Sequence, residues 1–204
     1  VVGIVLGVYI GTIVLLNIPN IQQAMSVFVA EELSEVLNTK VVIGRINMGL
    51  LNRIIIDDVL LDDQSGQEML KVTRLSAKFD IMPFFKGKIS ISSVQLFGFN
   101  INLRKETPDS PPNFKFVLDA FASKDTVKKE NSLDLRINSI LIRRGRMSYH
   151  VLSEEETPGK FNAKHIQLQN IIANISLKAL SKDSLNLGIK RLSLDEKASG
   201  FSLK

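Results

Sequence analysis

Histidine is the residue type of this chain best suited to acid–base chemistry, and there are two of them, His150 and His165. Nucleophilic catalysis needs a base within reach of a nucleophile. Each histidine falls within a pattern typical of a strand, no acid stands at a spacing that suggests a catalytic set, and the chain contains no cysteine. The sequence therefore predicts no catalytic site, no metal site and no cofactor, and we expect a protein that is not an enzyme.

Acidic residues gather around Gly66, namely Asp57, Asp58, Asp62, Asp63 and Glu68. Calcium-binding loops place several oxygen ligands around a glycine turn. The usual ligand order is missing here, because Gln64 and Gly66 occupy the third and fifth positions when Asp62 is counted as the first. A solvated hairpin tip is therefore the better interpretation.

Three arginines, Arg143, Arg144 and Arg146, could bind phosphate or lipid headgroups. Proteins that bind single-stranded nucleic acid add aromatic side chains on which bases stack, and no alternating aromatics accompany these arginines. A solvated strand end is the simpler interpretation. With a modest net charge of +5 and no phosphate-loop or dinucleotide motif, the sequence predicts no nucleic-acid partner.

Alternating apolar residues predict that strands carry most of these side chains. The clearest alternation runs over 89–103, where Phe97, Phe99, Ile101 and Leu103 fall two apart, as they would on one face of a strand. Similar runs cover 41–48, 54–61, 70–79, 132–151, 166–177, 185–194 and 201 onward. The predicted fold class is mainly β (α+β), with helices at the N-terminus followed by a curved, elongated β-sheet.

A six-residue pattern recurs within these runs, with two polar residues between apolar residues of one face. It occurs at 43–48, 56–61, 72–77, 91–96, 137–142, 168–173 and 189–194. Keeping both apolar residues on the same face requires a bulge, which bends the strand. We therefore expect the sheet to be curved by bulges.

The first 30 residues contain no charged side chain. At about 1.5 Å per residue, the apolar stretch 1–16 would cover roughly 24 Å of a hydrocarbon core about 30 Å thick. We predict a truncated transmembrane helix over 1–18, with the anchoring residues Val1, Val2, Ile4, Val5, Leu6, Val8, Ile10, Ile13, Val14, Leu15 and Leu16. A signal-peptide core and a buried helix are the alternatives.

A second helix is predicted over 19–40. Its apolar residues recur at spacings of three and four, as Ile21, Met25, Phe28, Val29, Leu33, Val36 and Leu37, with Glu31, Glu32 and Glu35 on the other side. Helices that lie on membranes usually carry basic polar faces. The acidic face predicts that this amphipathic helix caps the open end of the sheet.

Residues 41–204 form the predicted β-domain, with a helical insertion at about 105–131 that contains a loop at 107–112 and a short helix at 113–122. Two helices are too few to cover the apolar face of such a sheet. An uncovered apolar face suits acyl chains. We therefore expect a lipid groove lined by Phe97, Phe99, Ile101, Leu103, Ile140 and Ile142.

Three stretches resemble the N-terminal region of AsmA-like proteins: LSEVLNTKVVIGRI at 33–46, IDDVLL at 56–61 and DIMPFFKGKISISSVQL at 80–96. The resemblance covers essentially the whole chain. Within the family it is strongest to the TamB branch of Bacteroidetes-type bacteria. It implies a β-groove similar to that of bridge-like lipid-transfer proteins.

The resemblance also implies a location and partners. Such proteins sit in the inner membrane with one span and a periplasmic body, and take part in phospholipid transport between the inner and outer membranes, with phospholipid as cargo. The alternative role is a scaffold that helps outer-membrane β-barrel proteins insert, with a TamA- or BamA-type barrel protein as partner. A parent chain that continues beyond residue 204 is expected.

Overall fold

The computed structural model describes residues 3, 7, 10–11, 14–15, 17–49, 52–80, 89–122, 133–134, 139–180 and 185–204. The helices with defined bounds in this part of the chain are α2 (Pro19–Leu37) and α4 (Lys115–Ala122). The strands are β1 (Val41–Gly49), β2 (Arg53–Asp62), β3 (Glu68–Phe79), β4 (Ile89–Lys105), β5 (Leu133–Asp134), β6 (Ser139–Val151), β7 (His165–Leu180), β8 (Leu185–Glu196) and β9 (Ser202–Leu203). These bounds confirm the mainly β prediction.

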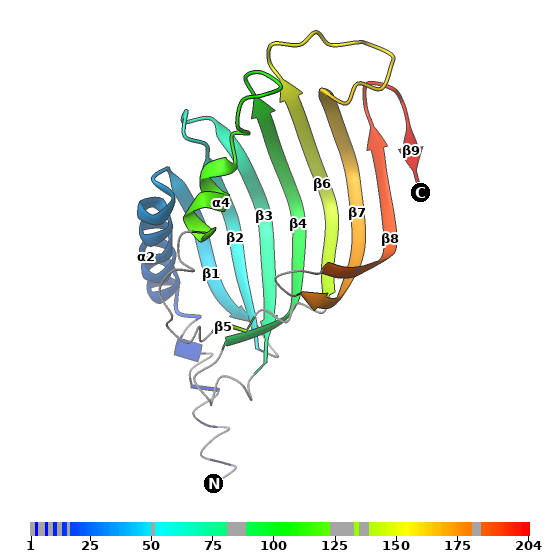
Figure 1. Ribbon diagram of the computed structural model, residues 1–204. Coiled ribbons are helices and arrows are strands. Elements are labelled where there is room, and N and C mark those ends of the chain that lie inside the picture. The colour runs from blue at the N-terminus through cyan, green and yellow to red at the C-terminus, as the bar shows by residue number, and fades with distance from the viewer. Residues whose placement is uncertain are drawn as a thin grey trace.

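The strands form one open, mixed sheet in the order β1-β2-β3-β4-β6-β7-β8-β9, and β5 pairs with the start of β4 (Figure 1). Neighbours along this order are antiparallel except β4 and β6, which run parallel. Parallel neighbours need a crossover connection, and α4 lies in the segment that joins these two strands. The predicted helical insertion is therefore the crossover that the sheet topology requires.

Strands β1, β2, β3, β4, β6 and β7 share a line of irregular positions near their middles. At this line the regular pairing of neighbouring strands is interrupted. Gly44 of β1 lies opposite Asp58 of β2, and Asp58 lies opposite Thr73 of β3. Thr73 in turn lies opposite Gly98 of β4, which lies beside Arg144 of β6. Four residues on this line have left-handed backbone angles, with φ values of 56° at Asp58, 64° at Gly98, 54° at Arg144 and 53° at Asn170. We call this line the crease; its members are Gly44, Asp58, Thr73, Gly98, Arg144 and Asn170.

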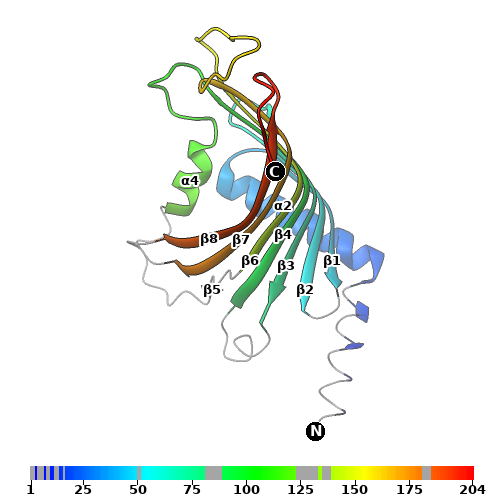
Figure 2. The same ribbon diagram turned by 90° about the vertical axis from the view of Figure 1, so that its right-hand side faces the viewer.

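Several of the predicted bulges lie on the crease. Four of the six-residue patterns contain one of its members, at 43–48, 56–61, 72–77 and 168–173. In β4 and β6 the crease instead lies at Gly98 and Arg144, beyond the patterns at 91–96 and 137–142. A left-handed residue in a strand bends it, and the strands curve so that α4 lies on the concave side (Figure 2).

Helix α2 begins after Ile18 and ends at Asn38, which takes a left-handed conformation (φ 48°) and donates its backbone N–H to the carbonyls of Glu35 and Ser34. Asparagine is one of the few non-glycine residues that adopts this conformation readily. The helix contacts the sheet at β1. It therefore lies along the β1 edge of the sheet.

The buried face of α2 differs from the predicted apolar stripe. Gln22 and Ser26 are buried, and the Ser26 hydroxyl donates to the Gln22 carbonyl (2.8 Å). Phe28 is 63% exposed, and it shares a side of the helix with Glu31 and Glu32, three and four residues further on. The assignment of Phe28 to the packed face was wrong, because Met25, Val29, Ala30 and Leu33 already fill the contact with the sheet.

The predicted membrane anchor is described only in part. Ile10, Val14 and Leu15 are helical and exposed. The other anchoring residues lie outside the described residues: Val1, Val2, Ile4, Val5, Leu6, Val8, Ile13 and Leu16. Among the helices that are described, none is both long enough and apolar enough to cross a membrane.

Candidate functional site

The apolar side chains form two clusters on the sheet. The first, which we call the covered cluster, has the buried residues Leu37, Val41, Ile43, Ile46, Leu61 and Met69. Residues from both helices pack against it, among them Leu33 of α2 and Val117 of α4. It is therefore a conventional core between helices and sheet.

The second cluster, which we call the strand cluster, is built differently. Its buried members are Val72, Phe99 and Ile171, and the residues packed against them are Val59, Leu70, Leu75, Leu96, Ile101, Ile142, Met147, Leu168 and Leu194. All of these described residues belong to strands, from β2 to β8. Leu70 also packs on the covered cluster, which puts the strand cluster on the same, concave face as α4 (Figure 2).

Three of the six predicted groove residues lie in the strand cluster. Phe99 is 7% exposed at its centre, and Ile101 and Ile142 pack around it. Leu103 and Ile140 are half-buried on β4 and β6, outside the residues that define the cluster. The sequence thus located the centre of this face through β4 and β6.

Phe97 is the exception, and its assignment to the same face as Phe99 was wrong. Leu96, its neighbour in the strand, packs in the strand cluster with Phe99, whereas Phe97 is 38% exposed. In the register, Leu96 pairs with Leu75 and Ile142, which belong to the strand cluster, whereas Phe97 pairs with the exposed Arg74 and Arg143. The cause is Gly98, whose left-handed conformation (φ 64°) breaks the two-residue alternation between the two rings.

Gly145 of β6 makes room for the central ring of the strand cluster. A Cβ added at this position would overlap Cζ and Cε1 of Phe99 and lie 3.0 Å from Cβ of Ile171. An aromatic ring that lies over a strand glycine fills the space left by the missing side chain. Among the described residues, Phe99 is therefore buried by the sheet itself, which explains how it is only 7% exposed although no described helix packs on it.

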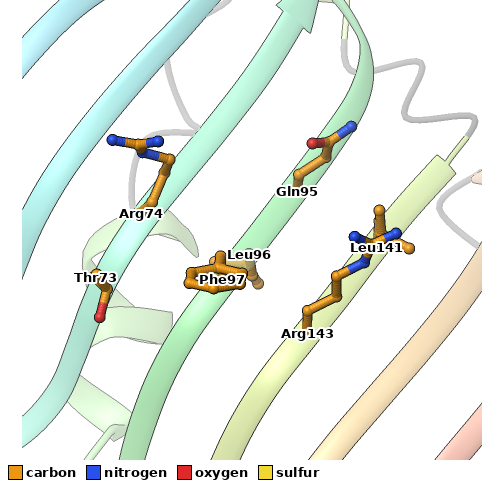
Figure 3. A pocket seen from close by; sticks show the side chains of 7 residues that line it. All are labelled: Thr73, Arg74, Gln95, Leu96, Phe97, Leu141 and Arg143. Carbon is orange, nitrogen blue, oxygen red and sulfur yellow. The ribbon is translucent and has the colours of Figure 1, made fainter.

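The opposite, convex face has its own feature around Phe97. A pocket of about 420 Å³ is lined by Thr73, Arg74, Gln95, Leu96, Phe97, Leu141 and Arg143 (Figure 3). The guanidinium of Arg144 lies over the Phe97 ring, 5.2 Å from its centre, a distance that suits a cation–π contact. The arginines were expected at a solvated strand end; they are exposed but stand mid-strand, at the crease.

Arg74 in this pocket already has an anionic partner. Its Nε donates to Oδ1 of Asp57 at 2.6 Å and its Nη2 to Oδ2 at 3.2 Å. The hydrogen bonds to Asp57 and the charge of this carboxylate raise the pKa of Arg74. Asp57 is 8% exposed, so the pair neutralises a carboxylate that the sheet has removed from water.

Asp63, in the acidic turn after β2, serves the protein's own backbone. Its Oδ1 accepts from the Ser65 backbone N–H (3.0 Å), the Ser65 hydroxyl (2.6 Å) and the Gln67 N–H (3.2 Å), and its Oδ2 from Arg104 (2.6 Å) and Asn113 (3.1 Å). Burial alone would raise the pKa of Asp63, but these hydrogen bonds outweigh it and lower the pKa. At 2% exposed, Asp63 is not part of a solvated tip; it joins the β2–β3 turn to the end of β4 and the segment before α4.

A scan against protein-family models finds no match for this chain, and a search of curated proteins finds none either.

Proposed function

We propose that this protein binds the acyl chains of phospholipids along the concave face of its sheet and takes part in phospholipid transport between the inner and outer membranes of a bacterial envelope. The observation that carries the proposal is the strand cluster. It is an apolar surface that continues the covered cluster, yet its described contacts come from strands alone. A curved apolar sheet face of this kind shields acyl chains while headgroups stay in water.

The proposal assigns the N-terminal residues 1–18 to the inner membrane. Asn17 donates its side-chain amide to the carbonyl of Met48 (3.0 Å), near the end of β1. Asn17, which directly precedes the entry of α2, therefore lies at the end of β1 that carries Met48. In this arrangement, the periplasmic concave face begins close to the lipid source, and no enzymatic step is needed.

Two charged substitutions in the strand cluster test the proposal. Ile101→Asp and Ile142→Asp place a carboxylate on the concave face at half-buried positions, whereas Phe99→Asp would also disrupt the packing on Gly145. We expect co-purifying phospholipid, measured by mass spectrometry on the full chain, to fall at least about tenfold, because an unpaired charge strongly disfavours an apolar surface.

Phe97→Asp is the matched control, since Phe97 lies on the same strand but on the convex face. It should retain the lipid of the unmodified protein. Unchanged lipid in folded Ile101→Asp and Ile142→Asp proteins, or an equal loss in Phe97→Asp, would contradict the proposal.

The second candidate is a scaffold for outer-membrane β-barrel insertion, and one observation favours it. Only Leu194 and Asp195 of β8 pair with β9 in the described part of the chain. The preceding residues of β8 present backbone donors and acceptors along that edge, where a partner strand could add. Ile189 is 56% exposed, so a photo-crosslinker can be placed there. It should capture barrel precursors if this role holds, and no precursor should be captured if it does not.

A further inference from the structure

The two histidines, 15 residues apart in the chain, meet at one end of the sheet. His150 near the end of β6 and His165 at the start of β7 are directly opposed in the antiparallel register. Their Nδ1 atoms lie 3.0 Å apart. The loop that joins these strands extends from the end of the sheet away from the N-terminus (Figure 1).

Hydrogen bonding fixes the protonation of one of these rings. The Nε2 atom of His165 lies 2.9 Å from the backbone carbonyl oxygen of Glu154. A carbonyl only accepts, so Nε2 carries the proton and Nδ1 of the neutral ring presents a lone pair toward His150. A backbone carbonyl on the second ring nitrogen is the usual outer partner of a metal-binding histidine.

Glu156 of the connecting loop completes a three-atom set. Its Oε1 lies 3.7 Å from Nδ1 of His150 and 4.0 Å from Nδ1 of His165. A triangle with sides of 3.0, 3.7 and 4.0 Å has a point equidistant from its corners at about 2.1 Å, which matches zinc–nitrogen and zinc–oxygen bond lengths of roughly 2.0–2.2 Å. In the described part of the chain, these three residues bring their ligand atoms within 4.8 Å of one another, close enough to share one metal ion.

The donor set indicates the class of ion. Two imidazole nitrogens and one carboxylate oxygen suit borderline divalent transition metals such as zinc, whereas calcium and magnesium favour oxygen ligands. The side chain of Glu156 is 64% exposed and that of His165 is 9% exposed. A bound ion would therefore have a buried side formed by the strands and an open side for water.

We propose that His150, His165 and Glu156 bind one divalent transition-metal ion of the zinc class, and that this ion fastens the β6–β7 loop to the ends of its two strands. The inference is independent of lipid binding, because the site lies beyond the residues of the strand cluster. The ion links residues of β6, β7 and the loop. Its expected effect is slower backbone exchange in the loop.

Zinc titration of the purified full chain against a chromophoric chelator tests the site, with calcium and magnesium as comparison ions. We expect one zinc per chain, no displacement by the comparison ions, and shifted Nδ1 resonances of both histidines in nitrogen NMR spectra. His150→Gln and Glu156→Gln should weaken zinc binding by about tenfold or more, since even outer-shell changes cost 10- to 100-fold. Zinc should also slow hydrogen exchange over 152–164.

Glu155→Gln is the matched control, because Glu155 is exposed and the structure assigns it a contact only through its backbone carbonyl, to Asn162. It should bind zinc like the unmodified protein. The proposal is overturned if folded unmodified protein takes up no zinc, which would leave a simple hydrogen bond between the rings. Unmodified zinc affinity in both His150→Gln and Glu156→Gln would overturn it as well.

Discussion

The covered cluster and the strand cluster lie side by side on one face of one sheet, yet they reach burial by different means. Ile43 is 8% exposed in the cluster on which both helices pack, and Phe99 is 7% exposed in the cluster whose described members all belong to strands. In the covered cluster, residues of both helices form a second layer over the strand residues. In the strand cluster, the described neighbours of Phe99 belong to strands of the same layer, and most of them are half-buried.

A buried central residue therefore does not by itself show that a second layer of structure covers the sheet at that point. The covered cluster has six buried residues and ten that are partly buried, and the partly buried ones include residues of both helices. In the strand cluster, three residues are buried while nine are only partly so. Stability should therefore depend steeply on side-chain size in the covered cluster and weakly at the periphery of the strand cluster.

The largest expected effect is on the covered cluster. Ile43→Ala should lower the free energy of unfolding by about 2–5 kcal/mol, because it leaves a cavity between the sheet and the helices. Ile101→Ala, at the half-buried periphery of the strand cluster, should cost less than half as much. Denaturant unfolding of both variants measures the difference, and equal losses would remove the distinction between the clusters.

A smaller effect is expected at Gly145, where the strand cluster does depend on close packing. Gly145→Ala should destabilise the protein by about 1–3 kcal/mol, because the new methyl group overlaps the Phe99 ring. Adding Phe99→Leu should recover part of the loss, since it removes the overlapping ring atoms. If the double variant is as unstable as the sum of the two single variants, the ring is not what Gly145 accommodates.

Two buried carboxylates, one near each cluster, predict the response to acid. Glu196, at the end of β8, accepts hydrogen bonds from Ser199, Ala198 and Gln167. Burial opposes its charge, but these bonds prevail and lower its pKa from 4.5 to about 2. The pKa of Asp63, beside α4, is also lowered.

These lowered pKa values determine how the free energy of unfolding changes with pH. A carboxylate whose pKa is lower in the folded state stabilises fully above its unfolded pKa, and this stabilisation is lost as the pH falls toward the folded pKa. For Glu196 the window runs from pH 4.5 to about 2. Glu196→Gln should cost about 1–2 kcal/mol at neutral pH and flatten the decline below pH 4.5; an unchanged acid profile of unfolding would contradict this.

The smallest expected effect is at Phe28, on the outer side of α2. Phe28→Ser should change the free energy of unfolding by no more than about 0.5 kcal/mol, as is usual for exposed positions. Leu33→Ser, on the packed side of the same helix, is the contrasting variant and should cost several times more. Thermal unfolding measures both variants. A large loss of stability in Phe28→Ser would show that Phe28 does belong to the packed face, as the apolar stripe predicted.

Sequence periodicity by itself determined the elements of this protein. Alternation located most strands within a few residues, although the predicted run 132–151 covers both β5 and β6. The spacing of apolar residues located α2 and the short helix α4. These features depend on interactions between near neighbours in the chain, so they leave a local signal. The two-residue repeat also identified Phe99, Ile101 and Ile142 as members of one apolar face.

Tertiary structure decided two things: on which face of a strand a side chain lies after an irregular residue, and which distant segments pair with each other. Gly98 reversed the face of Phe97, because a left-handed residue shifts every later side chain of its strand. The parallel pairing of β4 with β6 turned an apparent insertion into a crossover. The antiparallel register placed His150 opposite His165, and the conformation of the loop brought Glu156 to both. Neither contact follows from spacing along the chain, so the sequence did not reveal them.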